Sequence, residues 1–267
     1  MNALVSKFAE PFTPRGVAAF ARVKSGWLFL AQAVIALIAA TSLTCFLDAN
    51  CYSVIHTAIQ NLPDTGKISF GRLHWDGDSS KMLAEGQLLA IDVDVDHSGT
   101  VHSTADIQVE FGHDSIRVYS ILPGYSEIYY PEWPAPFNRT DLQPKWDAWE
   151  VDILFITAAA AFITLLISWL ILATIYFLPV WIAGFLANRE LNLWASWKLS
   201  AAAVLPGALL MIAGIWLYDF GQVHLVSFSF IFAAHFVLGW IYLAASFFFL
   251  PRVSTATPKG NPFETRK

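Results

Sequence analysis

Four long apolar runs constrain this chain more than any other feature of its sequence. They are Trp27 to Leu47, Val151 to Leu178, Leu199 to Phe220 and Val223 to Leu250. A helix needs about 20 apolar residues to cross the hydrocarbon core of a bilayer, and each run meets that length. Acidic residues enter the runs only near their ends, at Asp152 and Asp219. The runs therefore predict a membrane α-helical fold with four transmembrane helices.

The composition agrees with burial in lipid. Of the residues, 56% are hydrophobic and 14% are charged, whereas an ordinary soluble domain is about half apolar and about a quarter charged. The formal charge of −5 lacks the basic footprint that nucleic-acid-binding proteins need. We therefore expect the lipid bilayer, and no nucleic acid, among the partners.

Lysine and arginine predict the orientation of the chain. Ten of the sixteen lie before the first run, between the second and third, or after the fourth. The segment Asp48 to Glu150 has the other six against sixteen acids, a formal charge of −10. Because the cytoplasmic side of a membrane retains Lys and Arg, we expect both termini to be cytoplasmic. The expected location is the bacterial cytoplasmic (inner) membrane, with the acidic segment outside.

These expectations divide the chain into eight parts. They are an N-terminal cytoplasmic segment (1–26), the first helix (27–47), an extracytoplasmic domain (48–150), the second helix (151–178), a cytoplasmic interfacial segment (179–198), the third helix (199–220), the fourth helix (223–250) and a cytoplasmic tail (251–267). Within the interfacial segment, Trp181 to Trp197 predicts a short helix lying on the membrane surface.

The outer domain is predicted to be α+β. Apolar residues at helical spacing from Cys51 to Leu62 indicate that the first helix continues as an amphipathic stalk. Period-two alternation then predicts an antiparallel meander of four or five strands, with a bulge at Gly71 and turns at Gly99 and Gly112. We expect its apolar face to pack on the stalk and its acidic face to remain free. Prolines from Pro131 to Pro144 predict an extended return to the membrane.

The acidic face supplies the one candidate metal site. Asp92, Asp94 and Asp96 place three carboxylates on one side of a strand, with His97 and His102 nearby. Calcium prefers oxygen ligands at this density. However, the sixth position of the calcium-loop pattern is His97 instead of Gly, and the strand pattern is not that of a loop. The alternative is a solvated acidic face, and we expect no cofactor.

Three further groups are candidates within or beside the helices. His235 lies mid-way along the fourth run, with Thr164 and Ser168 at similar depth on the second. An ionisable group in a membrane is a functional candidate, although these hydroxyls could also bond a structural, neutral imidazole. Pro206 predicts a kink in the third helix. Cys45 and Cys51 are compatible either with a local disulfide or with two free thiols.

Several short motifs carry a resemblance to a known family. They are Pro11-Phe12-Thr13-Pro14-Arg15, Leu62-Pro63 followed by Gly66-Lys67-Ile68-Ser69, Ala90-Ile91-Asp92 with Gly99 after it, and Leu205-Pro206. With the overall layout, they resemble an uncharacterised, Yip-like bacterial multi-pass membrane family found near maltodextrin-utilisation genes. The resemblance implies a strand-rich outer insert after the first helix. It brings no activity and no catalytic residue, and members often have one more span than the four predicted here.

The absence of a recognisable catalytic motif favours a non-enzymatic role. We expect an accessory or sensing component whose acidic outer domain binds a partner or an envelope component. A protein partner could bind through this domain or through the helix bundle. The alternative is a small transporter or channel component that uses His235 and the Pro206 kink. A membrane enzyme with a metal on the face from Asp92 to His102 is a third hypothesis.

Overall fold

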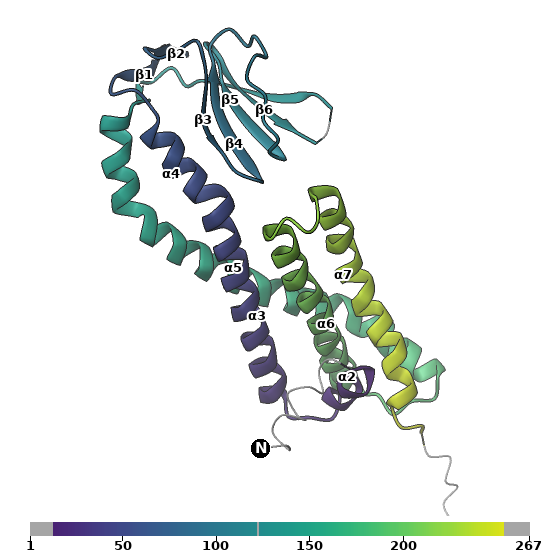
Figure 1. The fold of residues 1–267 in the computed structure, drawn as a ribbon. Helices are drawn as coiled ribbons and strands as arrows, with labels where there is room; N and C mark the ends of the chain where they lie inside the picture. The colour runs from purple at the N-terminus through teal and green to yellow at the C-terminus, as the bar shows by residue number, and fades with distance from the viewer. Residues whose placement is uncertain (1–12, 122, 254–267) are drawn as a thin grey trace, which may run out of the picture. The chain divides into compact units, whose positions relative to one another are not determined.

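The computed structural model describes residues 13–121 and 123–253 (Figure 1). The chain divides into two compact units. These are a helical unit (13–37, 164–211 and 231–253) and a sheet unit (38–121, 123–163 and 212–230). The predicted N-terminal segment up to residue 12 and the predicted tail from residue 254 lie outside the described residues.

Long helices dominate the described residues. They are α2 (Pro14–Phe20), α3 (Ser25–Leu47), a π-helical turn η2 (Asp48–Tyr52), α4 (Ser53–Gln60), α5 (Arg139–Leu186), α6 (Leu193–Asp219), α7 (Leu225–Ser246) and the 3-10 turn η3 (Phe247–Phe249). Among the described residues, four helical segments are long and apolar enough to cross a membrane: Ser25–Gln60, Arg139–Leu186, Leu193–Asp219 and Leu225–Phe249. The predicted number of such helices is confirmed.

The start of α5 differs from the prediction. The chain is not extended up to Pro144, because α5 already begins at Arg139. The side chain of Asn138 accepts a hydrogen bond from the Asp141 N–H at 2.8 Å, and such a cap stabilises a helix start. Pro144 has no N–H to donate within the helix. This cap and the apolar run that follows offset the cost of that missing hydrogen bond.

The connection between α5 and α6 also corrects the sequence prediction. No separate helix spans Trp181 to Trp197, because α5 runs on to Leu186 and α6 begins at Leu193. Between them, Asn188 adopts a φ of 51°, a left-handed conformation that asparagine tolerates better than most residues. The apolar residues that predicted one surface helix therefore belong to the end of α5 and the start of α6.

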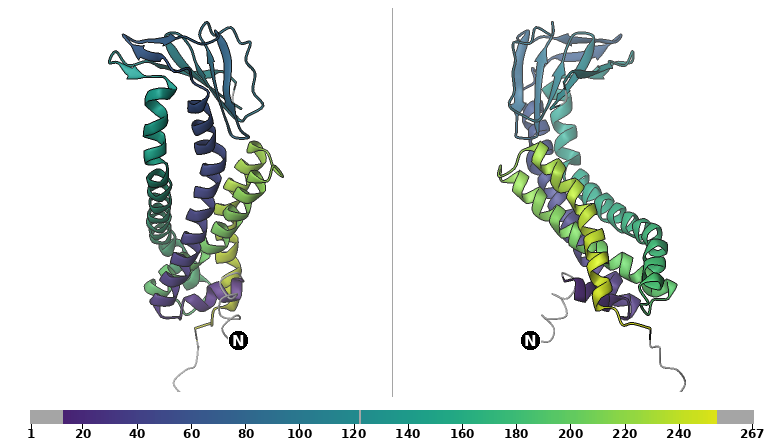
Figure 2. Two further views of the ribbon diagram at one scale, coloured as in Figure 1. Left: turned by 60° about the vertical axis from the view of Figure 1, so that its left-hand side comes forward. Right: turned by 90° about the vertical axis from the view of Figure 1, so that its right-hand side faces the viewer.

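In the helical unit, small residues allow close packing of α6. Ala201, Ala202 and Ala203 are buried, and Gln32 of α3 donates to the Ala201 carbonyl at 3.2 Å. α6 and α7 run side by side (Figure 2). A Cβ added at Gly207 would lie 2.4 Å from the His235 carbonyl oxygen. The Pro206-Gly207 pair thus lies inside a continuous helix, at a point where the α7 backbone approaches closely.

The sheet unit contains two sheets. One has the order β2 (Arg72–Trp75), β1 (Gly66–Ser69), β8 (Ala135–Pro136), and the other has the order β3 (Ser80–Glu85), β4 (Leu89–Asp94), β5 (Ile107–Phe111), β6 (Ser115–Ser120), β7 (Tyr125–Tyr129). All strand pairs are antiparallel except β4 and β5, which are parallel. The predicted simple antiparallel meander is therefore wrong at its centre. Parallel neighbours need a crossover connection, and residues 95–106, the crossover segment, provide it.

The predicted bulge at Gly71 is instead a hairpin turn. Phe70 and Gly71 have φ values of 55° and 71°, and Ser69 pairs directly with Arg72. Two successive residues with positive φ form the tight turn that suits the twist of a two-stranded hairpin. The apolar residues alternate at even positions before Gly71 and at odd positions after it. This switch arises because the chain reverses direction at the turn.

The stalk helix α4 covers the apolar face of the five-stranded sheet, as the sequence predicts (Figure 1). Val54, Ala58 and Leu62 join a core with Leu83 and Val93. Burial of apolar surface contributes roughly 25 cal/mol per Å², so this core stabilises the association of helix and sheet.

Candidate functional site

The acidic face of the five-stranded sheet is closed, in contrast to the free face that the sequence predicts. It consists of Asp92 and Asp94 on β4 and Glu110 on β5, which are 0%, 0% and 3% exposed. The crossover segment makes hydrogen bonds with these strands and returns the chain to β5 in parallel. Because buried carboxylates need hydrogen-bond donors, the partners of each one decide what the face can do.

Asp94 is the well-satisfied carboxylate of this face. It accepts hydrogen bonds from the hydroxyls of Ser98 and Ser80 and from the Gly99 N–H at 2.8 to 3.1 Å. Burial acts to raise its pKa, but these donors favour the ionised form and the net shift is downward. Asp94 therefore remains charged and holds the start of the crossover segment.

Asp92, two residues earlier on the same strand, is poorly satisfied. One oxygen accepts from the Gln108 amide at 2.9 Å, while Oδ2 is buried without a hydrogen-bond partner in the described structure. Burial raises the pKa of Asp92 to about 7, the Gln108 hydrogen bond opposes this rise, and the nearby Glu110 and Asp94 carboxylates add to it. Asp92 thus changes charge near neutral pH.

His97 connects the crossover segment to the third buried acid. Its Nδ1 lies 2.5 Å from Glu110 Oε1, and the residue has a φ of 51°. A Cβ at Gly112 would lie 2.1 Å from two atoms of the imidazole. The glycine therefore leaves the space that the ring needs in order to reach Glu110.

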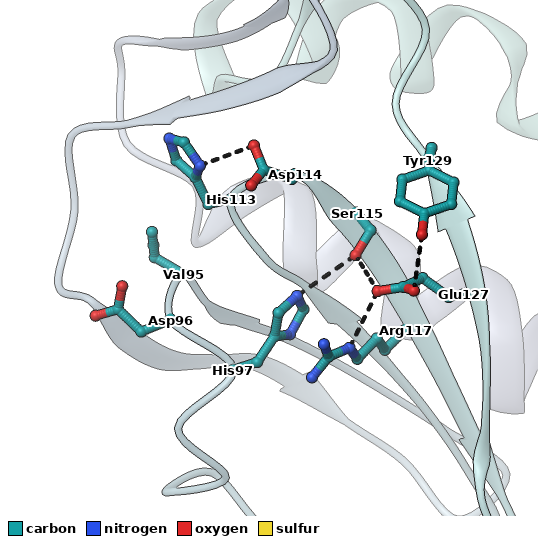
Figure 3. Close-up of a pocket in the computed structure, with 9 residues that line it drawn as sticks. All are labelled: Val95, Asp96, His97, His113, Asp114, Ser115, Arg117, Glu127 and Tyr129. Atoms are coloured by element: carbon teal, nitrogen blue, oxygen red, sulfur yellow. Dashed lines mark hydrogen bonds and ion pairs between the residues drawn. The ribbon is translucent and has the colours of Figure 1, made fainter.

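A polar pocket of about 570 Å³ opens beside this histidine (Figure 3). Its lining residues are Val95, Asp96, His97, His113, Asp114, Ser115, Arg117, Glu127 and Tyr129. Glu127 is the shared acceptor, with Ser115 at 2.8 Å, Tyr129 at 3.2 Å and the Arg117 Nε at 3.4 Å. These donors lower the pKa of Glu127, the Ser115 hydroxyl being the largest cause. Figure 3 shows Asp96 apart from this group.

Ser115, His97 and Glu110 have the order of a hydrolytic triad, yet their geometry indicates an internal network. The Ser115 hydroxyl lies 3.5 Å from His97 Nε2 and donates to Glu127 at the shorter distance of 2.8 Å. A nucleophile must be accessible and bonded to its base, whereas Ser115 is 3% exposed. The pocket is therefore suited to binding polar groups.

The candidate metal ligands do not assemble into a site. No group of three His, Cys, Asp or Glu residues within 13–121 and 123–253 could hold a metal ion. Asp92 and Asp94 are buried beneath the crossover segment, while Asp96 and His102 are exposed. The strand that places the carboxylates on one face also commits two of them to internal hydrogen bonds.

Among the described residues, strand β7 forms an open edge of the five-stranded sheet beside the pocket. All five of its residues are exposed, including Tyr129 at 73%, Ile128 at 54% and Tyr125 at 51%. The Arg117 guanidinium lies 4.6 Å from the centre of the Tyr125 ring. Tyr129 and Glu127 belong both to this strand and to the pocket wall, so the β7 edge and the pocket form one continuous surface.

Thr164 and Ser168, the hydroxyls that could bond His235, make no hydrogen bond to it in the described structure. Ser168 donates to the Leu165 carbonyl of its own helix at 2.8 Å, and Thr164 is exposed. The His235 Nδ1 bonds to the Phe232 carbonyl, and its ring packs against Phe236 with centroids 3.7 Å apart. His235 thus has a local partner, which favours a structural role.

The cysteines are free thiols. Cys45 and Cys51 lie on the continuous helical segment Ser25–Gln60. Six residues of helix rise by about 9 Å, whereas a disulfide requires Cα atoms within about 7 Å. The disulfide that the sequence left open is therefore absent.

Sequence reasoning missed Glu110, Ser115, Arg117 and Glu127, although it singled out His97. Glu110 and Arg117 are paired across β5 and β6, but only the strand order brings His97 to them. The one usable signal was the alternation that placed Glu110 on the same face as the aspartates.

Comparison with known proteins adds no relative to this description. No family model matches the chain, and no curated protein or solved structure matches it either. The resemblance to a Yip-like family therefore stays a prediction.

Proposed function

We propose that this chain is a membrane-anchored binding protein without enzymatic activity. In this proposal the two sheets lie on the extracytoplasmic side of a bacterial inner membrane and both termini are cytoplasmic. The β7 edge and the polar pocket together bind a protein partner. The observation that carries the proposal is that all five residues of β7 are exposed beside a pocket of about 570 Å³.

An open strand edge with large exposed side chains is costly to leave uncovered. Unpaired N–H and C=O groups on an edge pair readily with another chain, and proteins usually protect such edges. β7 instead displays Tyr125, Ile128 and Tyr129. Tyrosine is enriched in protein interfaces, and an extended peptide can add to a sheet edge as a further strand. These features support a partner that docks along β7.

The charge of the outer segment supports a basic partner. Residues 48–150 have a formal charge of −10, and the pocket lining has three acids, Asp96, Asp114 and Glu127, against one arginine, Arg117. Complementary charge increases association rates and excludes partners of the wrong sign. A partner segment with Lys or Arg next to an extended apolar stretch would match this surface.

Site-specific photo-crosslinking in the full chain tests this function. A photoreactive phenylalanine analogue at Tyr129 is expected to give a discrete crosslinked product in native membranes, and Ile128→Lys should abolish that product. The matched control position is Asp76, which is exposed on the β2 to β3 connection. Equal crosslinking at Tyr129 and Asp76, or none at Tyr129, would contradict partner binding at β7.

Orientation needs a separate test. A single cysteine at Asp76, in a chain whose Cys45 and Cys51 are changed to Ser, should react with a membrane-impermeant maleimide from the periplasmic side. Reaction only after the inner membrane is opened would reverse the proposed topology.

A further inference from the structure

The helical unit contains an apolar crevice that ends at an arginine. The crevice has a volume of about 520 Å³ and lies between the last turns of α5 and of α7. Val180, Ala183, Trp240, Leu243 and Phe248 are among its apolar lining residues, and Arg189 is its charged one. A small-molecule site in a protein is typically a crevice of about this size with few polar groups.

Arg189 is held in place but keeps donors for a ligand. Its Nη1 donates to the Leu250 carbonyl at 2.7 Å, and its Nε is buried without a hydrogen-bond partner in the described structure. The backbone beside it is fixed, because Arg189 and Arg252 form an isolated β-bridge and the Val253 N–H donates to the Asn188 carbonyl. An arginine carries five N–H donors suited to phosphate, so one bond to a carbonyl leaves most of them available.

The neighbouring charges favour an anion. The described segments 13–26, 187–198 and 251–253 contain six Lys and Arg residues and one acid, Glu190. Glu190 lies 3.8 Å from Arg22 rather than pairing with Arg189. The crevice thus has apolar walls and ends at Arg189, whose charge is not paired with an acid among the described residues.

We propose that this crevice is a binding site for one anionic phospholipid, with an acyl chain along Trp240 and Leu243 and the phosphate at Arg189. In a membrane, basic pockets between helices are known to bind anionic headgroups, and the apolar floor matches a hydrocarbon chain. The site requires that α5 and α7 lie in a bilayer. It depends neither on the orientation of the sheet unit nor on the partner at β7, so it can fail or succeed independently.

The experiment titrates the purified full chain in detergent with phosphatidylglycerol, phosphatidylcholine or glycerol 3-phosphate, and measures binding by native mass spectrometry and the shift in Tm. Ligand that binds the folded state raises Tm. Phosphatidylglycerol is expected to bind and to raise Tm at concentrations where the other two do not. Arg189→Gln should weaken the binding of phosphatidylglycerol by about tenfold or more, which is the loss expected for charge-assisted hydrogen bonds.

Two variants separate loss of the site from loss of the fold. Ala244→Phe fills the crevice at an exposed position while leaving Arg189 intact, and it should also abolish the phosphatidylglycerol shift. Lys24→Gln removes an exposed cation at the same end of the unit and should retain the shift. An equal response to phosphatidylcholine, an equal response to glycerol 3-phosphate, or a shift that persists in both Arg189→Gln and Ala244→Phe would overturn the proposal.

Discussion

The two faces of the five-stranded sheet are closed by opposite means. On one face, α4 covers Leu83 and Val93 through apolar contacts. On the other face, the crossover segment donates hydrogen bonds to Asp94. Gln108 of β5 donates both to Asp92 and to the Val101 carbonyl of the crossover segment. Apolar burial does not depend on pH, whereas hydrogen bonds to carboxylates depend on which group is charged. The stability of the second face should therefore respond to pH, and that of the first should not.

Within the acidic face, Asp92 and Asp94 repeat this contrast at close range. Several donors keep Asp94 charged with a lowered pKa, while burial with a single donor raises that of Asp92 to about 7. Two aspartates on the same strand face therefore have pKa values shifted in opposite directions, because they accept different numbers of hydrogen bonds.

The largest effect is expected on the apolar face. Leu83→Ala should reduce the free energy of unfolding by about 2–5 kcal/mol, because it leaves a cavity beneath α4. Pulse proteolysis of the full chain in urea measures this loss, and it should be the same at pH 5 and pH 8. A loss that changed with pH would show that the two faces are not independent.

Asp92→Asn is expected to have the next largest effect, and its sign depends on pH. A pKa raised above its unfolded value means that the folded state holds a proton that the unfolded chain releases. Stability is then fully present below the unfolded pKa and falls as pH rises toward 7, by roughly 1.4 kcal/mol per pH unit. Asp92→Asn should flatten this decline and stabilise the chain at pH 8.

The control for this variant is Asp96→Asn, which changes an exposed carboxylate two residues beyond the end of β4. It should keep the slope of the unmodified chain between pH 5 and pH 7. An unchanged slope in Asp92→Asn would exclude Asp92 as the titrating group.

Asp94→Asn should destabilise by about 1.5–3 kcal/mol at pH 7, the cost of weakening hydrogen bonds to a charged acceptor. Because the pKa of Asp94 is lowered on folding, its contribution is present above the unfolded value and is lost as pH falls through the folded one. The Tm difference between variant and unmodified chain should therefore shrink at low pH. A difference that grew under acid would contradict the role of these donors.

The smallest effect is expected at the exposed end of the crossover segment. Glu85 accepts from the Ser103 hydroxyl and the Thr104 N–H at 2.7 and 2.8 Å, but water competes for these bonds. Glu85→Gln should change the free energy of unfolding by less than about 1 kcal/mol. A loss as large as that of Asp94→Asn would mean that the segment is held mainly at this end.

The long helices could be predicted from the sequence because length and apolarity alone decide whether a segment can cross a membrane. Alternation likewise identified β4 and β5. It could not give their relative direction, because alternation fixes the face a side chain occupies and not the order of strands. The turn-like residues around Gly99 suggested a hairpin, whereas they belong to a crossover.

The site was less predictable than the fold. His97 and Glu110 are 13 residues apart in the sequence, and only the parallel pairing of β4 and β5 places their side chains together. Strand β3 was missed because Lys81, Met82, Leu83 and Ala84 do not alternate; an irregularity in its pairing lies between Met82 and Ala84. The open β7 edge became visible only when the strand order was known.

Hydrogen–deuterium exchange on the full chain tests the central claim, which is that the crossover closes the acidic face and leaves β7 open. Peptides covering residues 89–94 and 107–111 should be strongly protected, and a peptide covering residues 125–129 should exchange rapidly at its outward N–H groups. Rapid exchange in β4 and β5 together with protection of β7 would contradict both the parallel pairing and the open edge.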